Sequence, residues 1–217
     1  SVILNVTPCA YEVIMLMSLM DLSGPQPADG GGFLEGKLLI AMPGMPDPRF
    51  EQSVVFICAH SAQGAMGIII NKPIDGLSFR DLMVKLDVGI ETQGPQTPVL
   101  FGGPVHMTRG FVLHSAEYGQ TGSEATLAIT SEISLTATVD ILRAICEGHG
   151  PEKSIMALGY AGWGEGQIEN EILANGWIHC DADAALIFGT DFEAKWRQAL
   201  GKLGADISGL SAEAGRA

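Results

Sequence analysis

The sequence predicts an α+β fold in a single compact domain. Short apolar runs rich in β-branched residues recur along the chain, while the helical stretches between them are few and isolated. The two strongest runs, residues 54–58 and 66–70, are joined by the link Ser61-Ala62-Gln63-Gly64, which has hairpin length. This mixed order favours α+β over a doubly wound parallel sheet, in which strands and helices alternate regularly.

The predicted strands are apolar runs bounded by glycine, proline or polar residues. Residues 43–48 include three prolines and are predicted to form a loop, because proline cannot serve in a central ladder. The polar interval 117–124 is predicted to be a surface loop. In chain order the predicted strands are 37–42, 54–58, 66–70, 99–101, 109–114, 126–130, 134–138, 154–160, 177–180 and 184–188.

The predicted helices show apolar residues at helical spacing. Ser78 is a favourable N-cap for the first of them. The glycine-rich turn 161–167 leads into the third, which Asn175-Gly176 ends, because these residues tolerate left-handed backbone. In chain order the helices are 79–86, 139–147, the stretch with Ile168, Ile172 and Leu173 on one side, and the stretch from a Thr190 cap through Trp196 to Leu203.

The charge balance bears on the class of partner. The chain of 217 residues has 12 basic and 25 acidic residues, a formal net charge of −13. Such a charge repels phosphate backbones, and the lysines and arginines are scattered singly rather than gathered in a stripe. We therefore expect no direct binding to nucleic acid. A helix-turn-helix is not expected either, because the predicted helices are isolated between strands.

The cysteines indicate the cellular compartment and whether a metal site is expected. Cys9, Cys58, Cys146 and Cys180 lie far apart and form no CxxC pair, and with five scattered histidines they give no zinc spacing. Reduced thiols of this kind are typical of a cytoplasmic protein. We expect that location, and we expect neither a metal nor a cofactor.

Residues 1–33 are predicted to be an appendage to a domain formed by residues 34–217. The apolar run 13–20 is far shorter than the roughly 20 residues of a membrane-spanning helix, and no lysine or arginine precedes it. Residues 24–32 are rich in glycine and proline, which is typical of a linker. We expect no membrane association, and the sequence leaves the oligomeric state open.

Polar residues gather at the ends of the central strands. Asn71 and Lys72 follow the second strong run, and Gly102 and Gly103 follow the strand 99–101. Pockets tend to form where strand ends combine polar side chains with glycine backbone that no side chain covers. With the charge of Arg109 nearby, we expect this group to bind a ligand or partner. The competing interpretation is that the glycines serve tight turns and the cations cover the rim.

Cys58 and His60 are the candidates for thiol chemistry. Side chains two positions apart in a regular strand point to the same face. A thiolate activated by a neighbouring imidazole could act as a redox sensor or as a nucleophile. Cysteine is also among the most buried residue types, so structural burial is the alternative interpretation.

The turn Gly162-Trp163-Gly164-Glu165-Gly166-Gln167 does not match a phosphate-binding loop. The dinucleotide pattern needs glycine at the position of Gln167, and the Walker pattern needs a lysine followed by serine or threonine. We expect capping and close packing beneath Trp163 instead. The chain has no GxSxG nucleophile elbow, and we predict no catalytic residues.

Several segments resemble the AlgH-like (YqgE) family of small bacterial proteins. They follow the family's order from about residue 34 to the C-terminus and read GKLLIAMPGMPDPRFEQSVVFIC, GAMGIIINKP, GGPVHMTRGFVLHS and GYAGWGEGQIENEILANGWI, with a tail helix near Trp196. The resemblance implies a largely antiparallel, barrel-like sheet with flanking helices. One position departs from the family, which usually has an acidic residue where this chain has Ala59, between Cys58 and His60.

The resemblance also bears on function. The family carries the label of a transcriptional regulator, tied to control of alginate production, but has no agreed ligand, catalytic residue or DNA complex. With the charge balance, this favours a non-enzymatic regulatory protein that acts through a protein or small-molecule partner. The alternative is a thiol-redox sensor or an enzyme that uses Cys58 with His60.

Overall fold

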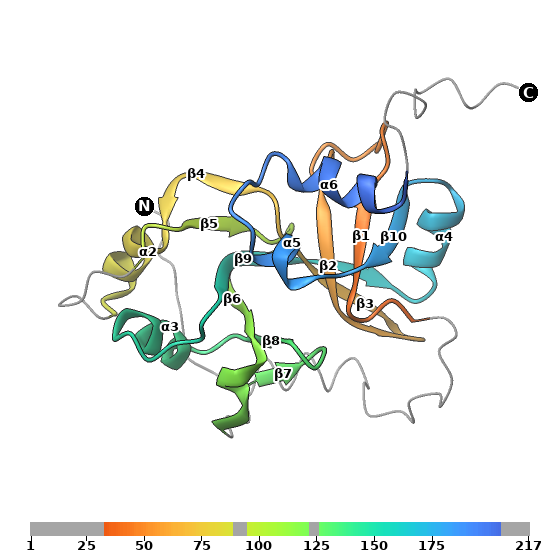
Figure 1. Ribbon diagram of the computed structural model, residues 1–217. Coiled ribbons are helices and arrows are strands. Elements are labelled where there is room, and N and C mark those ends of the chain that lie inside the picture. Colours follow the sequence, from red (N-terminus) through yellow and green to blue (C-terminus); the bar gives the residue numbers. More distant parts are fainter. Residues whose placement is uncertain (1–32, 89–94, 122–125, 205–217) are drawn as a thin grey trace, which may run out of the picture.

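The computed structural model describes residues 33–88, 95–121 and 126–204. Within these ranges a ten-stranded, largely antiparallel sheet runs in the order β10-β1-β2-β3-β9-β6-β8-β7, with β4 and β5 beside this path. Figure 1 shows the sheet curled, with helices around it, which confirms the α+β class and the barrel-like sheet. The strands are β1 Lys37–Ala41, β2 Val54–Ser61, β3 Gly64–Ile69, β4 Pro73–Ser78, β5 Pro98–Phe101, β6 Val105–Ser115, β7 Thr126–Ala128, β8 Ile133–Thr136, β9 Ser154–Gly164 and β10 Trp177–Asp181.

The central hairpin β2–β3 has the position that the sequence predicts. The two strands pair antiparallel, with Val55 opposite Ile69. On the other side of β2 lies β1, where Ile40 is opposite Val54. All residues of β2 except Ser61 are buried. A strand is buried on both sides only when layers cover both faces of its sheet.

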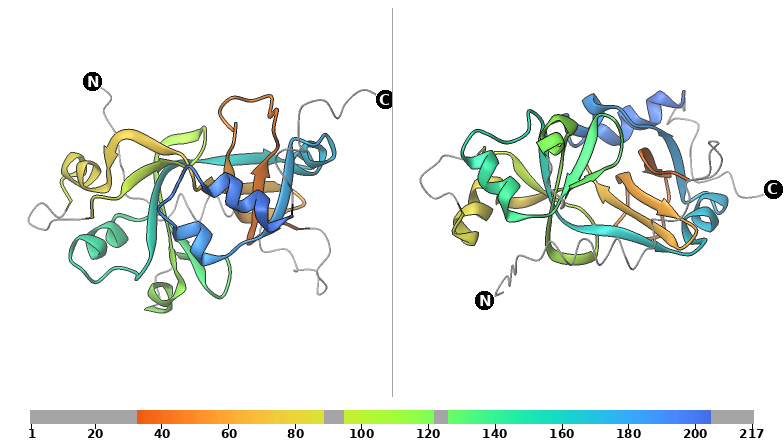
Figure 2. Two further views of the ribbon diagram at one scale, coloured as in Figure 1. Left: turned by 45° about the horizontal axis from the view of Figure 1, so that its top comes forward. Right: turned by 90° about the horizontal axis from the view of Figure 1, so that it is seen from below.

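The core accordingly lies on both faces of the sheet. Val54 and Phe56 belong to one cluster, whereas Val55 and Ile57 belong to the other, as strand alternation requires. Side chains of α5 and α6 cover the first face, and α4 with the β1–β2 loop covers the second. A third cluster lies beneath α2 and α3, at the end of the molecule opposite α4 (Figure 2).

The long strand β9 joins the two parts of the sheet. Its last residues, 161–164, pair with β3, whereas its first part pairs with β6 and, in parallel, with β5. Gly159 lies where the partner changes and has a φ of +73°. A Cβ atom on Gly159 would lie 2.3 Å from the carbonyl oxygen of Gly103. Only glycine fits this point, because both the left-handed backbone and the close approach exclude a side chain.

Helix α2 begins at a side-chain cap. The Ser78 side chain accepts from the Asp81 N–H group at 3.1 Å, and the Asp81 carboxylate accepts from the Ser78 N–H group at 3.0 Å. This capping box confirms Ser78 as the predicted N-cap. At the end of the third predicted helix, Asn175 is left-handed, with a φ of +57°. The helices are α2 Phe79–Leu86, α3 Val139–Cys146, α4 Gln167–Leu173, α5 Ala184–Phe188 and α6 Lys195–Lys202.

One predicted element is wrong, because residues 184–188 form helix α5 and not a strand. The Asp183 side chain accepts a hydrogen bond of 2.7 Å from the Leu186 N–H group and caps the helix. The five-residue run is apolar throughout, and periodicity alone does not distinguish a short buried strand from a short buried helix. The aspartate before the run was the signal for a helix.

Two strands extend beyond or outside the prediction. β9 continues to Gly164, through most of the turn predicted at 161–167. The prediction also lacked β4, which starts at Pro73, a strand-end position where the missing N–H group of proline is tolerated. Part of the predicted loop 117–124 is a 3-10 helix, η1, over Ala116–Thr121.

No helix in the part of the chain described above has the length and apolar character needed to cross a membrane.

Candidate functional site

The ends of β3 and β5 lie side by side. The Ile69 N–H group donates to the Gly102 carbonyl at 2.9 Å, and the Phe101 N–H group donates to the Lys72 carbonyl at 2.8 Å. We call residues 69–73 with 101–103 the strand-end junction. It brings together four of the five residues expected to bind a ligand or partner, Asn71, Lys72, Gly102 and Gly103.

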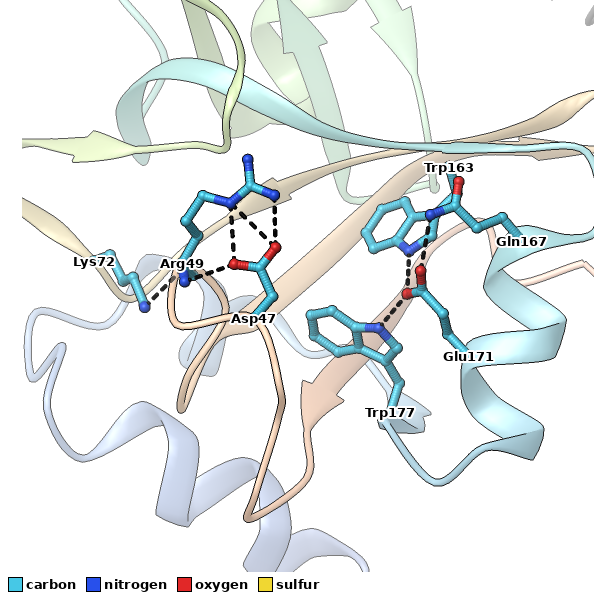
Figure 3. A network of polar contacts seen from close by, with 7 residues as sticks. All are labelled: Asp47, Arg49, Lys72, Trp163, Gln167, Glu171 and Trp177. Carbon is cyan, nitrogen blue, oxygen red and sulfur yellow. Dashed lines mark hydrogen bonds and ion pairs between the residues drawn. The ribbon is translucent and has the colours of Figure 1, made fainter.

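The side chains of Asn71 and Lys72 hold the β1–β2 loop. Asn71 Oδ1 accepts from the Val54 N–H group at 2.8 Å, and Asn71 Nδ2 donates to the Gln52 carbonyl at 2.8 Å. Lys72 Nζ donates to the Arg49 carbonyl at 2.9 Å, as Figure 3 shows. Burial lowers the pKa of Lys72, and nearby carboxylates oppose this effect. Both side chains are therefore bound to backbone groups of the protein itself.

Gly102 and Gly103 permit close approach of the backbone to β9. A Cβ atom on Gly102 would lie 2.2 Å from the Gly159 carbonyl oxygen, and one on Gly103 would lie 2.1 Å from the Tyr160 carbonyl carbon. Gly103 also has a φ of +151°. The backbone of Gly102 and Gly103, which was expected to face a ligand, is therefore packed against Gly159 and Tyr160 of β9.

After the junction, β6 bulges away from β9. Val105 pairs with Tyr160, and Gly110 pairs with Leu158, so residues 106–109 stand opposite Gly159 alone. We call residues 105–110 the β6 bulge. Bulges of this kind are frequent beside functional sites, where they aim side chains out of the sheet.

The β6 bulge presents exposed side chains on a constrained backbone. His106 has a φ of +46°, a left-handed value that is uncommon for a residue with a side chain. His106, Met107 and Thr108 are exposed, and Met107 retains 58% of its accessible surface. An uncommon conformation of this kind persists when the surrounding structure imposes it.

A row of rings lies beneath the β6 bulge. The Tyr160 ring is 5.9 Å from the His106 ring and 5.9 Å from the Phe111 ring. The guanidinium carbon of Arg109 is 5.6 Å from the centre of the Phe111 ring. Burial raises the pKa of Tyr160, and the positive charge of Arg109 opposes that rise. Arg109, the fifth expected binding residue, therefore lies at the β6 bulge.

Cys58 is enclosed in the core. Its side chain has no exposed surface, and its Sγ atom donates to the Phe56 carbonyl at 3.5 Å. Burial raises the pKa of the Cys58 thiol, because a thiolate is poorly solvated in apolar surroundings. The group is therefore a neutral thiol at physiological pH, which is the form that does not act as a nucleophile.

His60 has different neighbours from those of Cys58. The pairing of β2 with β3 shifts register between Ile57 and Ala59, which interrupts the regular alternation of side chains. Cys58 packs in the cluster beneath α5 and α6, whereas His60 bonds to the Leu34 N–H group and to Glu169 of α4. The expected common face of Cys58 and His60 assumed a regular strand, which β2 is not at this point.

Comparison with protein families bears on the whole domain. The model of the family described as AlgH-like matches residues 38–208. The chain belongs to the AlgH-like family. This confirms the resemblance drawn from the sequence segments.

Relatives of this AlgH-like chain occur in other bacteria. A UPF0301 protein of Rhodopseudomonas palustris (strain HaA2) is 53% identical over 209 residues, which cover 91% of this chain and 95% of the relative. The UPF0301 protein blr1492 of Bradyrhizobium diazoefficiens is 53% identical over 202 residues, which cover 90% of this chain and 94% of the relative. These names state a family and no activity.

Two solved structures are similar to this chain. The AlgH protein from Pseudomonas aeruginosa has 38% sequence identity and a TM-score of 0.69, and the match covers 88% of this chain and 100% of AlgH. Protein DIP2367 from Corynebacterium diphtheriae has 17% identity and a TM-score of 0.63, with coverage of 80% and 89%. At that identity the second match shows the fold alone.

The sequence did not predict a carboxylate that joins two indole rings in this AlgH-like domain. Glu171 Oε2 accepts from Trp163 Nε1 at 3.0 Å and from Trp177 Nε1 at 2.8 Å. Glu171 Oε1 accepts from Gln167 Nε2 at 2.8 Å (Figure 3). The spacing of Gln167 and Glu171, four residues apart on α4, was the available signal. Packing beneath Trp163 was expected, but its polar partner was not.

The rings of this network also position the β1–β2 loop. The Phe50 ring lies 6.5 Å from the Trp163 ring and 5.5 Å from the Trp177 ring. In the same loop, Arg49 and Asp47 form an ion pair at 2.6 Å. Together with the bonds from Asn71 and Lys72, these contacts fix the loop over the second face of the sheet.

Among the described residues, His, Cys, Asp and Glu form no group of three or more that could hold a metal ion.

Proposed function

We propose that this AlgH-like protein is a non-enzymatic regulatory protein that binds a protein or small-molecule partner at the β6 bulge. The observation that carries the proposal is the exposure of His106 and Met107 on backbone that cannot relax freely. Contacts between Gly103 and β9 hold the base of the bulge. A surface that is already ordered loses little conformational entropy on binding, so less of the free energy gained from its contacts is offset.

The state of Cys58 supports binding over thiol chemistry. A reactive cysteine is normally accessible and has a lowered pKa, whereas Cys58 is buried and its pKa is raised. The buried free cysteines Cys58 and Cys180 fit the reducing environment of the cytoplasm, where we place the protein. The net charge of −13 favours a partner other than nucleic acid.

The test compares what copurifies with three forms of the full chain. Met107→Asp places a charge on the β6 bulge. Leu173→Asp, on α4, is the matched control, because Leu173 is also an exposed apolar residue, at 80%. Each protein is purified under native conditions, and bound proteins and small molecules are identified by mass spectrometry. We expect a component that the wild type and Leu173→Asp retain and Met107→Asp loses.

The same experiment can contradict the proposal. Both substitutions change an exposed side chain, so unfolding temperatures close to that of the wild type are expected. If all three folded proteins retain the same components, the β6 bulge is not the binding surface. If the component is lost from Leu173→Asp alone, the surface lies on α4 instead.

A further inference from the structure

Residues 33–36 cross the end of β2, and we call them the N-terminal strap. The Gly36 N–H group donates to the Ile57 carbonyl at 2.9 Å. Leu34 is buried, and the Phe33 ring lies edge-on to the His60 ring at 5.1 Å. Phe33, expected to be part of an N-terminal appendage, therefore contacts the domain. The strap is held to β2 by one backbone hydrogen bond, by contacts to His60 and by burial of Leu34 in the apolar cluster that contains Ile57.

His60 connects the strap to α4 through both ring nitrogens. Nδ1 accepts from the Leu34 N–H group at 3.0 Å, and Nε2 lies 3.0 Å from Glu169 Oε1. A ring nitrogen that accepts a hydrogen bond carries no proton, so the hydrogen-bond pattern places the proton of the neutral ring on Nε2. The His60 side chain is only 1% exposed. Its Nδ1 atom therefore has no access to water while the Leu34 bond is present.

We propose that the N-terminal strap is a pH-responsive latch, closed by the hydrogen bond from Leu34 to His60 and opened when His60 takes up a second proton. A protonated imidazole has two N–H donors, so its Nδ1 would face the Leu34 N–H group as donor against donor. The bond must break before Nδ1 binds a proton. The open strap thus binds a proton that the closed strap excludes, and acidification favours opening. Histidines ordinarily take up this proton below about pH 6.5.

The titratable groups around His60 come from α4, the strap and β2. The Glu169 carboxylate attracts an imidazolium and therefore stabilises the protonated ring once the strap has opened. Cys58 of β2 stays a neutral thiol, because burial raises its pKa. Ala65, which lies opposite His60 in β3, has no charge, and neither has any other residue of β3.

Glu35 of the strap has the opposite effect. Burial raises its pKa, although the hydrogen bond from the His60 backbone N–H group opposes that rise. The closed strap thus holds a proton on Glu35 more tightly than the open strap does. Through this residue alone, acidification toward the ordinary pKa of 4.5 would favour closing.

Opening the strap would uncover the His60 imidazole beside the Glu169 carboxylate, which is already exposed in the closed form. The strap would then control access to the His60 ring at the end of β2. This inference does not depend on partner binding at the β6 bulge, since the latch uses residues 33–36, His60 and α4 only.

The test measures amide hydrogen exchange of Leu34 in the full-length protein by NMR from about pH 8 to about pH 5, corrected for intrinsic exchange. We expect the protection factor to fall below about pH 6.5, approaching tenfold per pH unit. In His60→Gln, the introduced amide can accept from Leu34 but does not titrate in this range. That variant is expected to show no fall in protection as the pH is lowered. Glu35→Gln is expected to retain the fall, because it removes the opposing group.

His149→Gln is the control, because His149 is an exposed histidine outside this network. It should reproduce the wild-type profile. The ¹⁵N shifts of the wild-type His60 ring give a readout that needs no variant. They should show Nδ1 without a proton at neutral pH and its protonation in the same range in which Leu34 loses protection. A constant protection factor in the wild type, an equal fall in His60→Gln, or a proton on Nδ1 at neutral pH would each overturn the latch.

Discussion

The Nζ atom of Lys195 donates a hydrogen bond of 2.9 Å to the carbonyl oxygen of Ile70, at the end of β3. A second hydrogen bond, of 2.7 Å, goes to the carbonyl of Ile187 in α5. The Phe192 ring lies 4.9 Å away, and the lysine is 1% exposed. The partners of this amine are thus carbonyl dipoles and a ring rather than a carboxylate. Burial lowers the pKa of Lys195 from 10.5 to about 8.

Lys195 is expected to make stability rise with pH. Between about pH 8 and 10.5 the unfolded chain keeps a proton on this amine that the folded chain has released. Unfolding therefore takes up a proton, and the free energy of unfolding increases with pH by up to about 3 kcal/mol through this residue. Denaturant unfolding of the wild type and of Lys195→Met near pH 7.5 and near pH 10 measures the effect, and the variant should lose this part of the rise.

The comparison needs a control for charge, because other groups titrate in the same range. Lys85→Met removes a lysine from the exposed side of α2 and corrects for the loss of one positive charge. Lys195→Met leaves two buried carbonyls without their donor, so its stability should be lower by about 1–3 kcal/mol at pH 10. The explanation by a buried charge is wrong if Lys195→Met shows the same rise with pH as the wild type.

Glu171 is expected to contribute strongly to stability. Its carboxylate is the hydrogen-bond acceptor for the buried indoles of Trp163 and Trp177. Glu171→Ala leaves both N–H groups without this acceptor, and a buried donor without a partner costs about 1–3 kcal/mol. We expect Glu171→Ala to lower the free energy of unfolding by about 2–4 kcal/mol, measured by denaturant unfolding followed by tryptophan fluorescence.

Two further variants separate the hydrogen bonds from the charge. Glu171→Gln keeps one acceptor oxygen and should cost less than Glu171→Ala. Glu165→Ala, an exposed glutamate in the turn before α4, removes the same charge without touching an indole and should change stability by less than about 0.5 kcal/mol. Equal losses for Glu165→Ala and Glu171→Ala would contradict the proposed role.

Most strands and the Ser78 cap could be predicted because their causes are local, whereas the predicted Thr190 cap was wrong, since α6 follows Ala194. Ser78 precedes an amphipathic stretch, and the runs around Phe56 and Ile69 have the composition of buried strands. Residues 184–188 could not be assigned from composition, because the deciding feature was the cap formed by Asp183. The local signals were sufficient where cap, pattern and propensity agreed.

The candidate site could be predicted only in part. The sequence indicated the strand ends, and the structure brings Asn71, Lys72, Gly102 and Gly103 together there. Which of them face outward depends on the partners of each side chain, and these lie far away in the sequence. The β6 bulge adds exposed residues through a register shift that no local pattern encodes.

Three glycines should respond differently to alanine. At Gly103 an added Cβ atom would lie 2.1 Å from backbone, so Gly103→Ala is expected to lose more than about 4 kcal/mol or to fail to fold. Gly76 has a φ of +69° and open space around it, so Gly76→Ala should cost about 1–2 kcal/mol through backbone strain alone. Gly201, inside α6, also has open space, and Gly201→Ala should gain about 0.5–1 kcal/mol.

Thermal or denaturant unfolding of the three variants tests this order directly. If Gly103→Ala and Gly76→Ala were equally stable, backbone strain would explain both and the close approach to Tyr160 would have no effect. The result also bears on the β6 bulge, since Gly103 holds its base. A folded Gly103→Ala protein with wild-type stability would contradict the constrained backbone on which the binding proposal rests.

Cys58 is expected to be unreactive in the folded protein. Its thiol is fully buried and its pKa is raised, so both access and thiolate formation limit reaction with a maleimide at neutral pH. Mass spectrometry after labelling should find Cys58 unmodified in the native protein and modified in guanidinium chloride. Cys58→Ala identifies the peptide and should leave labelling of the other cysteines unchanged. Labelling of native Cys58 as fast as in the unfolded chain would instead favour the thiol-redox alternative.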